Sequence, residues 1–450
     1  MSDKKKLINL QKNISLNEVK NSDINFIERF ISKENISKLS TNSRNRIYTP
    51  KETLSMFISQ AINQDSSCQN MVNKLALNKE KDICISTSAY CKARGRLSTT
   101  VISNITKELA IKDEKRINSK WKFRGRSIYM IDGTTIIMPD TFSNQEAYPQ
   151  PKYQKEGLGF PISRLVGIIS LTTGSIIDVN IGTFAGKGTG ERMLLLDMLH
   201  NFKKGDIILA DALYSTYTFL SFAIEKGIDI VFVQNGSRTK KADFSTGKVL
   251  GRNDHIITLK KPKIKPDWME DKEFKALPKE LKIREIKTKN QILITTFLSK
   301  KKTNIKTIKN LYKQRWQIEV DFRNIKITLG LHTFKCKSPK MVKKEMWTYF
   351  LAYNMIRSLM LDSALYNKIL PRKISFKNSL QLYLHYLESY TQISYEKLLK
   401  LIAKKVIGDR GGRIEPRALK KRPNAYSLLM KPRKIAQQEV LKNGHPKKQK

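Results

Sequence analysis

Hydrophobic residues in the first quarter of the chain follow a helical spacing. From about residue 14 to residue 115 they recur at intervals of three and four, as in the segment that contains Leu54, Phe57 and Ile62. Few stretches in this part alternate between apolar and polar residues, as strands do. The pattern predicts an all-α N-terminal domain at residues 1–118.

After Asn118 the pattern changes to short runs rich in Ile and Val, bounded by Gly, Thr or Asp, which are typical of strands. The predicted strands are 127–138, 164–171, 175–181, 206–209 and 228–234. Helical stretches at 191–202 and 216–226 separate the later strands. This order predicts a mixed α/β domain at residues 119–360. Within it, short strands with charged or Pro-rich joins indicate a β insertion at about 236–299.

A long helix is predicted from Asn304 to about Leu329, where Gly330 supplies a C-terminal stop. Helical patterns return at 341–361 and 379–403. The tail from residue 410 is dense in Arg and Lys, and its prolines discourage long helices. We therefore predict a helical, basic C-terminal region at residues 361–450, which contacts DNA or forms a dimer.

The charge of the chain indicates what it binds. Lys and Arg number 85 against 40 Asp and Glu, a formal net charge of +45 over 450 residues. So large a charge repels itself in a compact protein unless a polyanion neutralises it, and nucleic acid is the densest polyanion available. The alternative is a ribosome-associated or merely basic protein from an AT-rich genome. Lys92, Arg94 and Arg96 on a predicted helix either contact DNA phosphates or form a solvated basic face.

Other features indicate where the protein acts. Lys4, Lys5 and Lys6 are not followed by an apolar segment of signal-peptide length, and the apolar stretch 347–360 is too short to span a bilayer. The four cysteines lack the spacing of a zinc site. We expect a soluble cytoplasmic protein with reduced thiols.

Two carboxylates occupy positions suited to catalysis. Asp132 interrupts the apolar run of a predicted strand, where a buried carboxylate needs a cation or a hydrogen-bond network. Asp211 closes the strand 206–209 at its C-terminal edge, the usual place for sites in open α/β sheets. Such acids can converge on divalent metal ions for phosphoryl transfer. For Asp211, capping of the following helix is an open alternative.

A third carboxylate lies on the long predicted helix. Tyr312, Arg315, Glu319 and Lys326 share one face if the helix keeps 3.6 residues per turn. This face presents one acid among three groups that bind phosphate. An ordinary salt bridge between Arg315 and Glu319, four residues apart, is the alternative.

These residues carry a family resemblance. The pattern Y-x2-R-x3-E-x6-K at 312–326 resembles the signature of bacterial insertion-sequence DDE transposases, and the segments around Asp132 and Asp211 resemble the first two acidic motifs of that family. The resemblance implies an α/β ribonuclease H-like catalytic domain with a β-strand insertion, flanked by an all-α N-terminal DNA-binding domain and the helical, basic C-terminal region. It also implies that Asp132, Asp211 and Glu319 are catalytic ligands of two Mg²⁺ ions, which Mn²⁺ can replace.

Further expectations follow from the same resemblance. Tyr312, Arg315 and Lys326 would hold phosphates at the transposon end, and a homodimer would bind the terminal inverted repeats and join the element to target double-stranded DNA. Phe297 or Trp316 would stack on an extruded base, unless both are ordinary core residues. Two other classes remain open: a catalytically inactive DNA-binding relative, and a ribonuclease H-like nuclease that does not join strands.

Two features are set aside. The loop from Gly182 to Gly190 lacks the spacing of a P-loop, so we interpret it as a basic loop near DNA or a simple turn. Asp140 belongs to the motif of Asp132 but would need a different strand register to reach a metal site.

Overall fold

The computed structural model describes residues 29–40, 47–78, 83–186, 189–239, 242–388, 393–408 and 429–443. Its N-terminal part is helical, as the apolar spacing predicts from residue 29 onward. Side-chain caps define several helix starts: the oxygens of Thr49 and Ser98 each accept a hydrogen bond from a backbone N–H three residues later. The helices are α3 (Lys33–Ser37), α4 (Pro50–Ile62), α5 (Cys68–Asn78), α6 (Ser88–Arg96) and α7 (Thr99–Arg116).

Across the described residues, nine strands form one sheet at the centre of the molecule, in the order β3-β2-β1-β4-β5-β9-β8-β7-β6. The strands are β1 (Ile128–Ile137), β2 (Ile162–Ser170), β3 (Ile176–Thr183), β4 (Ile207–Ala210), β5 (Asp229–Val233), β6 (Lys248–Gly251), β7 (Asp254–Lys260), β8 (Glu280–Lys287) and β9 (Ile292–Thr295). Strands β1, β4 and β5 are parallel, and the remaining pairs are antiparallel. All five strands predicted before residue 236 are confirmed. Strands β2 and β3 form an antiparallel hairpin.

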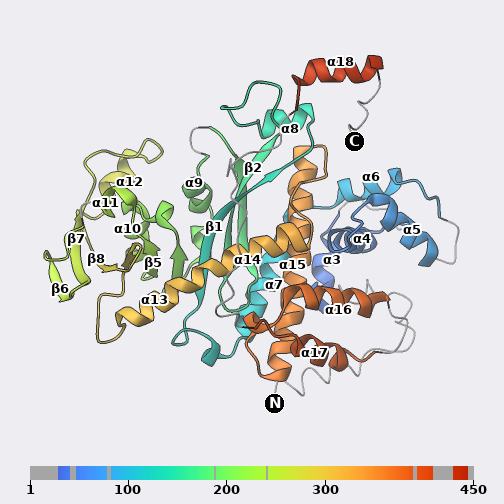
Figure 1. The fold of residues 1–450 in the computed structure, drawn as a ribbon. Coiled ribbons are helices and arrows are strands. Elements are labelled where there is room, and N and C mark those ends of the chain that lie inside the picture. The colour runs from blue at the N-terminus through green and yellow to red at the C-terminus, as the bar shows by residue number, and fades with distance from the viewer. Residues whose placement is uncertain are drawn as a thin grey trace.

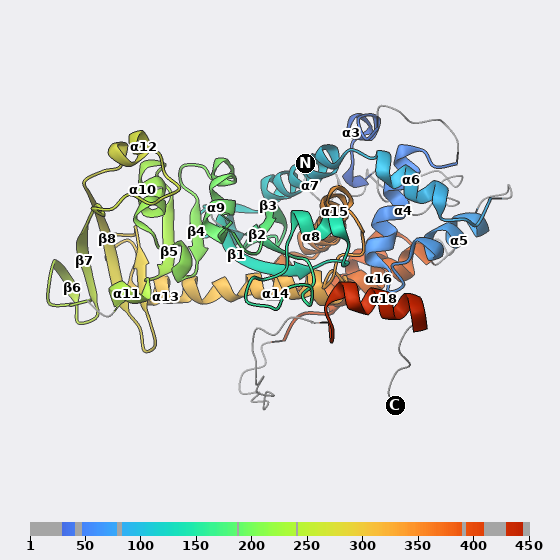
Figure 2. The same ribbon diagram turned by 90° about the horizontal axis from the view of Figure 1, so that it is seen from above.

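The strands of the predicted insertion extend this sheet. Strand β9 pairs with β5, and β8, β7 and β6 follow outward from it. Figure 1 shows them at one end of an elongated molecule, with the N- and C-terminal helices at the other end and α13 and α14 running between the two. The view from above shows the same arrangement (Figure 2).

Helices cover both faces of the sheet because apolar residues of the strands alternate between two cores. Helices α9 (Glu191–Leu196) and α10 (Tyr217–Glu225) pack on one face, against Ile131 and Ile208. On the other face, α7, α13 (Ile305–Lys313), α14 (Gln317–Arg323) and α15 (Pro339–Asn367) cover Met130 and Leu209. Short helices α8 (Phe142–Ala147), α11 (Gly236–Thr239) and α12 (Asp271–Ala276) lie in the joins.

For the long helix predicted over 304–329, both ends are confirmed, but the prediction of one uniform α-helix is wrong. Asn304 caps α13, and Gly330, with a φ of +81°, ends the segment. Between them, a 3₁₀ turn at Gln314–Trp316 separates α13 from α14, and a π-helical turn at Asn324–Thr328 follows α14. The constant 3.6-residue period assumed for this helix therefore does not hold at Lys326.

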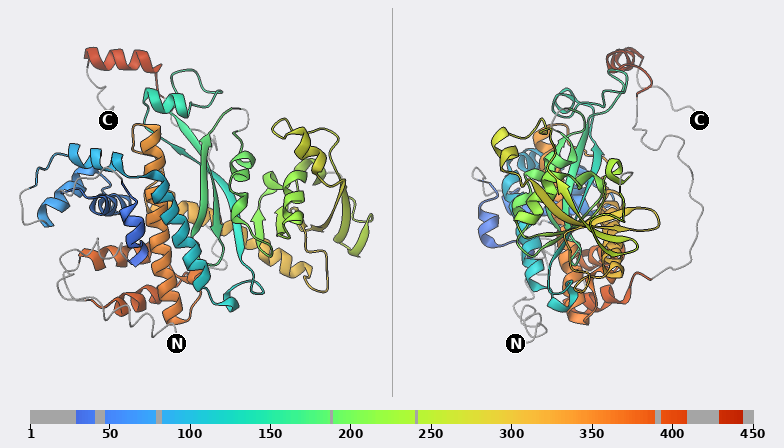
Figure 3. Two further views of the ribbon diagram at one scale, coloured as in Figure 1. Left: turned by 180° about the vertical axis from the view of Figure 1, so that it is seen from behind. Right: turned by 90° about the vertical axis from the view of Figure 1, so that its left-hand side faces the viewer.

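The C-terminal part contains α15, α16 (Phe376–Glu388), α17 (Tyr395–Lys404) and α18 (Arg433–Asn443). The predicted domain boundary at residues 360–361 falls inside α15, so the sheet and the C-terminal helices share one helix. Helix α18 begins directly after Pro432, and its Arg433 pairs with Asp140 in the join between β1 and α8. Figure 3 shows this helix, in red, at the upper edge of the molecule from two further sides. Most of the predicted basic tail, residues 409–428 and 444–450, lies outside the described residues.

Within the described residues, no helix has the length and apolar content needed to cross a bilayer.

On the basic helix α6, the predicted role of one residue changes. Arg94 is buried, donates a hydrogen bond to Gln60 and lies over the ring of Phe57 at 4.8 Å, whereas Lys92 and Arg96 are exposed. Arg94 is therefore a core residue, and only its two exposed neighbours can face DNA.

Candidate active site

The sheet brings Asp132 and Asp211 to the same edge. Strand β4 ends at Ala210, and its pairing with β1 stops at Met130, so β1 continues past the end of its parallel neighbour. Asp132 lies on this extension and Asp211 is the residue after β4. Asp211 also caps a 3₁₀ turn, Ala212–Tyr214, by accepting a hydrogen bond from the N–H of Leu213 at 2.9 Å. Asp211 therefore caps this short turn, whereas α10, the helix predicted to follow, is capped by Thr216. Oδ2 of Asp211 lies outside the bond to Leu213.

Asp132 is largely enclosed. The Gly133 N–H donates to its Oδ1 at 2.9 Å, and Nη1 of Arg315 donates to its Oδ2 at 3.2 Å. Burial raises the pKa of Asp132 to about 6; the Gly133 hydrogen bond and the Arg315 charge oppose this rise, and the neighbouring carboxylates Asp211 and Glu191 add to it. A carboxylate with these neighbours favours a further cation.

Arg315 connects the first and third predicted acids. Its Nη2 donates to Glu319 Oε1 at 2.8 Å while Nη1 holds Asp132. The salt bridge between Arg315 and Glu319 is therefore present, and it is part of a bridge between β1 and α14. The side chain of Glu319 is 60% exposed, so its second oxygen remains open to solvent.

The two other residues of the predicted phosphate-binding face are partly enclosed. Burial raises the pKa of Tyr312, and Arg315 opposes this rise. Lys326 donates from Nζ to the Thr134 hydroxyl at 3.1 Å and to the Thr135 carbonyl at 2.9 Å, and burial lowers its pKa. The π turn thus directs Lys326 onto β1, two residues beyond Asp132.

Sequence reasoning missed Glu191, the first residue of α9. Its carboxylate lies so close to Gly133 that a Cβ on residue 133 would be 2.2 Å from the Glu191 Cδ. The Tyr214 hydroxyl donates to Glu191 Oε2 at 3.1 Å, and burial raises the pKa of Glu191. A glycine inside a buried strand often marks a close approach of another group, so Gly133 was the available signal.

Sequence reasoning also missed the anchor beneath Glu319. Asp321, fully buried on α14, accepts hydrogen bonds from Arg357 Nη2 at 2.5 Å, Arg372 Nη1 at 2.7 Å and the Tyr353 hydroxyl at 3.1 Å. Arg372 also donates to the backbone carbonyls of Ser170 and Leu171 at the end of β2. This network fixes α14 to α15 and to the sheet. No short sequence pattern predicts this network, because its residues lie far apart in the chain.

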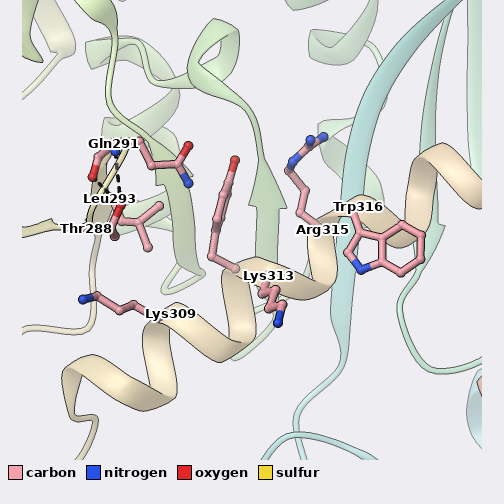
Figure 4. A pocket seen from close by; sticks show the side chains of 8 residues that line it. Thr288, Gln291, Leu293, Lys309, Lys313, Arg315 and Trp316 are labelled. Atoms are coloured by element: carbon pink, nitrogen blue, oxygen red, sulfur yellow. Dashed lines mark hydrogen bonds between the residues drawn. The ribbon is translucent and has the colours of Figure 1, made fainter. Parts of the chain in front are cut away.

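A cavity of about 300 Å³ opens beside α13, between this helix and the β8–β9 turn. Figure 4 shows Lys309, Lys313, Arg315 and Trp316 on the helix and Gln291 on the turn. The two aromatic candidates differ in position. Trp316 lines the cavity and is 51% exposed, whereas Phe297 is 9% exposed and packs against Phe123 and under Arg126.

The carboxylates of Asp132, Asp211 and Glu319 suit a hard divalent ion, although these side chains are not gathered around one point. Within the described part of the chain, no three His, Cys, Asp or Glu side chains are close enough to hold a metal ion. Instead, the guanidinium of Arg315 lies between Asp132 and Glu319 and supplies positive charge there. Carboxylate oxygens are the ligands that Mg²⁺ and Mn²⁺ prefer, so the residue types fit such an ion.

Acidic side chains near the ends of parallel strands, facing a helix that carries Arg and Lys, are typical of enzymes that act on phosphodiesters. The sequence profile of the family described as "Transposase DDE domain" matches residues 123–355, more than half of the chain. The chain belongs to this family of DDE transposases. It is a transposase of the insertion-sequence type, an enzyme that cleaves DNA and transfers strands.

Two known proteins are similar to the chain. It is 25% identical over 366 residues to the transposase InsG of insertion sequence element IS4 from Escherichia coli (strain K12), covering 77% of this chain and 79% of that protein. Among solved structures, a cryo-EM structure of a piggyBac transposase synaptic complex with hairpin DNA aligns with a TM-score of 0.45 and 10% identity, covering 87% of each chain.

Proposed function

We propose that Asp132, Asp211 and Glu319 are the catalytic carboxylates and hold two divalent ions, Mg²⁺ or Mn²⁺. When bound, the ions supply an activated oxygen nucleophile and stabilise the leaving oxygen. The observation that carries the proposal is the bridge of Arg315, which brings Glu319 of α14 to Asp132 beside the strand end that bears Asp211. To hold an ion, the exposed carboxylate of Glu319 would have to release Arg315.

Phosphates of the transposon end would lie along α13 and α14. Arg315 could donate two parallel hydrogen bonds to a phosphate, and Tyr312 lies beside it. Lys309 and Lys313 line the same cavity, so the positive charge continues beyond the signature residues. Lys326 reaches a phosphate only by leaving Thr134 and Thr135. Trp316, exposed at this cavity, is the better placed aromatic for stacking on an extruded base.

The remaining parts of the proposal concern assembly. We infer a ribonuclease H-like core within residues 119–360, a DNA-binding role for the helices before residue 118 and a homodimer on paired terminal inverted repeats, acting in the cytoplasm. Exposed apolar residues on and before α18, with Leu441 at 86% and Met430 at 98% exposed, support a partner surface in the C-terminal region.

The proposal is tested by measuring cleavage and strand joining on a labelled duplex that carries the element's own end. Asp211→Asn and Glu319→Gln should abolish both reactions with Mg²⁺ or Mn²⁺ and retain binding of the duplex. Glu225→Gln, a substitution of an exposed carboxylate on α10, is the matched control and should leave both reactions unchanged. Activity in either active-site variant at the wild-type rate would refute the assignment of that residue.

The reactions of the wild-type protein distinguish a transposase from the two alternative classes, an inactive DNA-binding relative and a nuclease. Binding without chemistry would identify an inactive DNA-binding relative. Cleavage without joining would identify a nuclease.

A further inference from the structure

A second and larger cavity lies on the other face of β1. It measures about 520 Å³, and its floor is the stretch Gly133–Thr135 directly after Asp132. Its walls are formed by Arg164 of β2, Phe184 directly after β3, Glu191 of α9 and Tyr153 of the loop after α8. None of these wall residues belongs to the predicted catalytic or phosphate-binding set.

The walls of this cavity are suited to a flat heteroaromatic group. The Arg164 guanidinium lies over the Phe184 ring at 5.0 Å, and Nη1 of Arg164 donates to the Thr189 carbonyl at 3.0 Å, which holds the pair in place. Tyr153 is 69% exposed and presents a second ring. Aromatic rings of this kind stack on any base of single-stranded nucleic acid.

The charge of the cavity argues against a phosphate as its occupant. Among the described residues that line the cavity, Arg164 is the one basic group, and Glu191 lies 4.0 Å from it and partly neutralises its charge. The carboxylate of Glu191 repels a phosphate but accepts a hydrogen bond from an exocyclic amino group, as on cytosine or adenine. Ring stacking combined with a partly buried acceptor suits a nucleobase.

The position of this cavity relates it to the reaction. The α13 cavity lies on the α14 side of β1, where Arg315 meets Asp132, whereas this cavity lies on the α9 side, where Glu191 covers Gly133. Gly133, on the floor of this cavity, directly follows Asp132 in β1, so a nucleotide next to a phosphate held at Asp132 is within reach of the cavity.

We propose that the α9-side cavity binds an unstacked nucleobase of the strand that lies across the reacting phosphate from the transposon end, with Glu191 selecting bases that carry an amino group. The inference rests on the proposed function. The base can come from flanking donor DNA before excision or from target DNA at joining, and both present the same chemistry.

Photo-crosslinking tests the proposal. 5-Iododeoxycytidine, which keeps the amino group, is placed at single positions in the flanking strand of a donor duplex, or in a target duplex, and crosslinked peptides are mapped. We expect crosslinks to Tyr153 or Phe184 from the first nucleotides beyond the scissile phosphate, in the donor arm, the target arm or both, which identifies the source. Tyr153→Ala and Phe184→Ala should each reduce the reaction of that arm about tenfold. Phe142→Ala removes an aromatic ring that is 86% exposed on α8 outside the cavity, and should have no effect.

Base preference provides a second readout. With cytosine or adenine at the crosslinking position, the wild type should react faster than with thymine, and Glu191→Gln should abolish this difference. If the wild type cleaves DNA but no arm crosslinks in this cavity, or if thymine is used equally well, the inference is wrong and the proposed function stands. If the wild type neither cleaves nor joins DNA, the proposed function itself fails.

Discussion

The carboxylate of Glu191 occupies the space that a side chain at Gly133 would need. A Cβ on residue 133 would lie 2.2 Å from Glu191 Cδ and 2.4 Å from each carboxylate oxygen. Gly133 has no left-handed backbone conformation, so alanine suits its backbone and only the contact with Glu191 opposes it. The atoms in the way are the end of a flexible side chain, so Gly133→Ala should displace the Glu191 carboxylate from the Tyr214 hydroxyl and cost about 1 kcal/mol of unfolding free energy, the value of one hydrogen bond.

A double-mutant cycle isolates this contact. In the Glu191→Ala background, Gly133→Ala should cost well under about 1 kcal/mol, because the clashing group is gone. The four proteins are compared by urea unfolding. Equal costs in the two backgrounds would show that Glu191 does not lie over Gly133.

The buried Asp321 gives a second prediction about the helix that carries Glu319. Asp321→Asn leaves the guanidiniums of Arg357 and Arg372 without a charged partner, and breaking a buried ion pair costs about 3–5 kcal/mol. Unfolding in urea should show this loss, and strand transfer should fall because α14 loses its anchor. Glu34→Gln breaks the exposed pair with Lys38 and should leave the unfolding midpoint unchanged. A midpoint equal to wild type in Asp321→Asn would refute the anchoring role.

The local features of the site were predictable from the sequence. A single acid inside an apolar run located Asp132, a strand followed by an acid located Asp211, and Gly330 marked the end of the signature segment. Each depends on neighbours within a few residues, where strand alternation and left-handed glycine conformations act directly. The family match over 123–355 confirms the class that these motifs indicated.

The contacts of the site were not predictable in the same way. Lys326 was expected beside Glu319 because a uniform helix would place it there, but a π turn changes the local period. Arg94 was expected on a basic face and is buried against Phe57, a residue of another helix. Glu191 approaches Gly133 across the fold. Such contacts depend on how helices dock on the sheet, which one sequence does not display.

Stability should depend on pH through Asp113. This residue is buried between α7 and α15, accepts hydrogen bonds from Ser358 at 3.0 Å and Arg116 at 3.2 Å, and has its pKa raised to about 7, chiefly by burial. The unfolded chain has the ordinary lower pKa, so the folded state keeps a proton that the unfolded state releases. The contribution of Asp113 is therefore complete below about pH 4 and is lost as the pH rises toward 7.

Asp113→Asn removes this titration. Between pH 5 and pH 7 the unfolding free energy of wild type should fall by about 2 kcal/mol relative to that of Asp113→Asn. Urea unfolding at several pH values measures the difference, and Glu225→Gln, on an exposed site, should follow wild type at every pH. Parallel curves for wild type and Asp113→Asn would mean that Asp113 is ionised in the folded protein.

Lys326 has two candidate roles, holding β1 and binding a DNA phosphate, which the sequence does not distinguish. If it holds β1, as its bonds to Thr134 and Thr135 indicate, Lys326→Met should lower the unfolding free energy by about 1–3 kcal/mol and leave the salt dependence of DNA binding nearly unchanged. Lys313→Ala, on the exposed side of α13, should do the opposite: little loss of stability and a slope of log K against log salt that is smaller by about 0.9, the value for one phosphate contact. Binding to the end duplex at several salt concentrations, with urea unfolding of each variant, measures both effects. A slope reduced by Lys326→Met at unchanged stability would instead make Lys326 a phosphate ligand, because a lysine held on β1 releases no counterion from DNA.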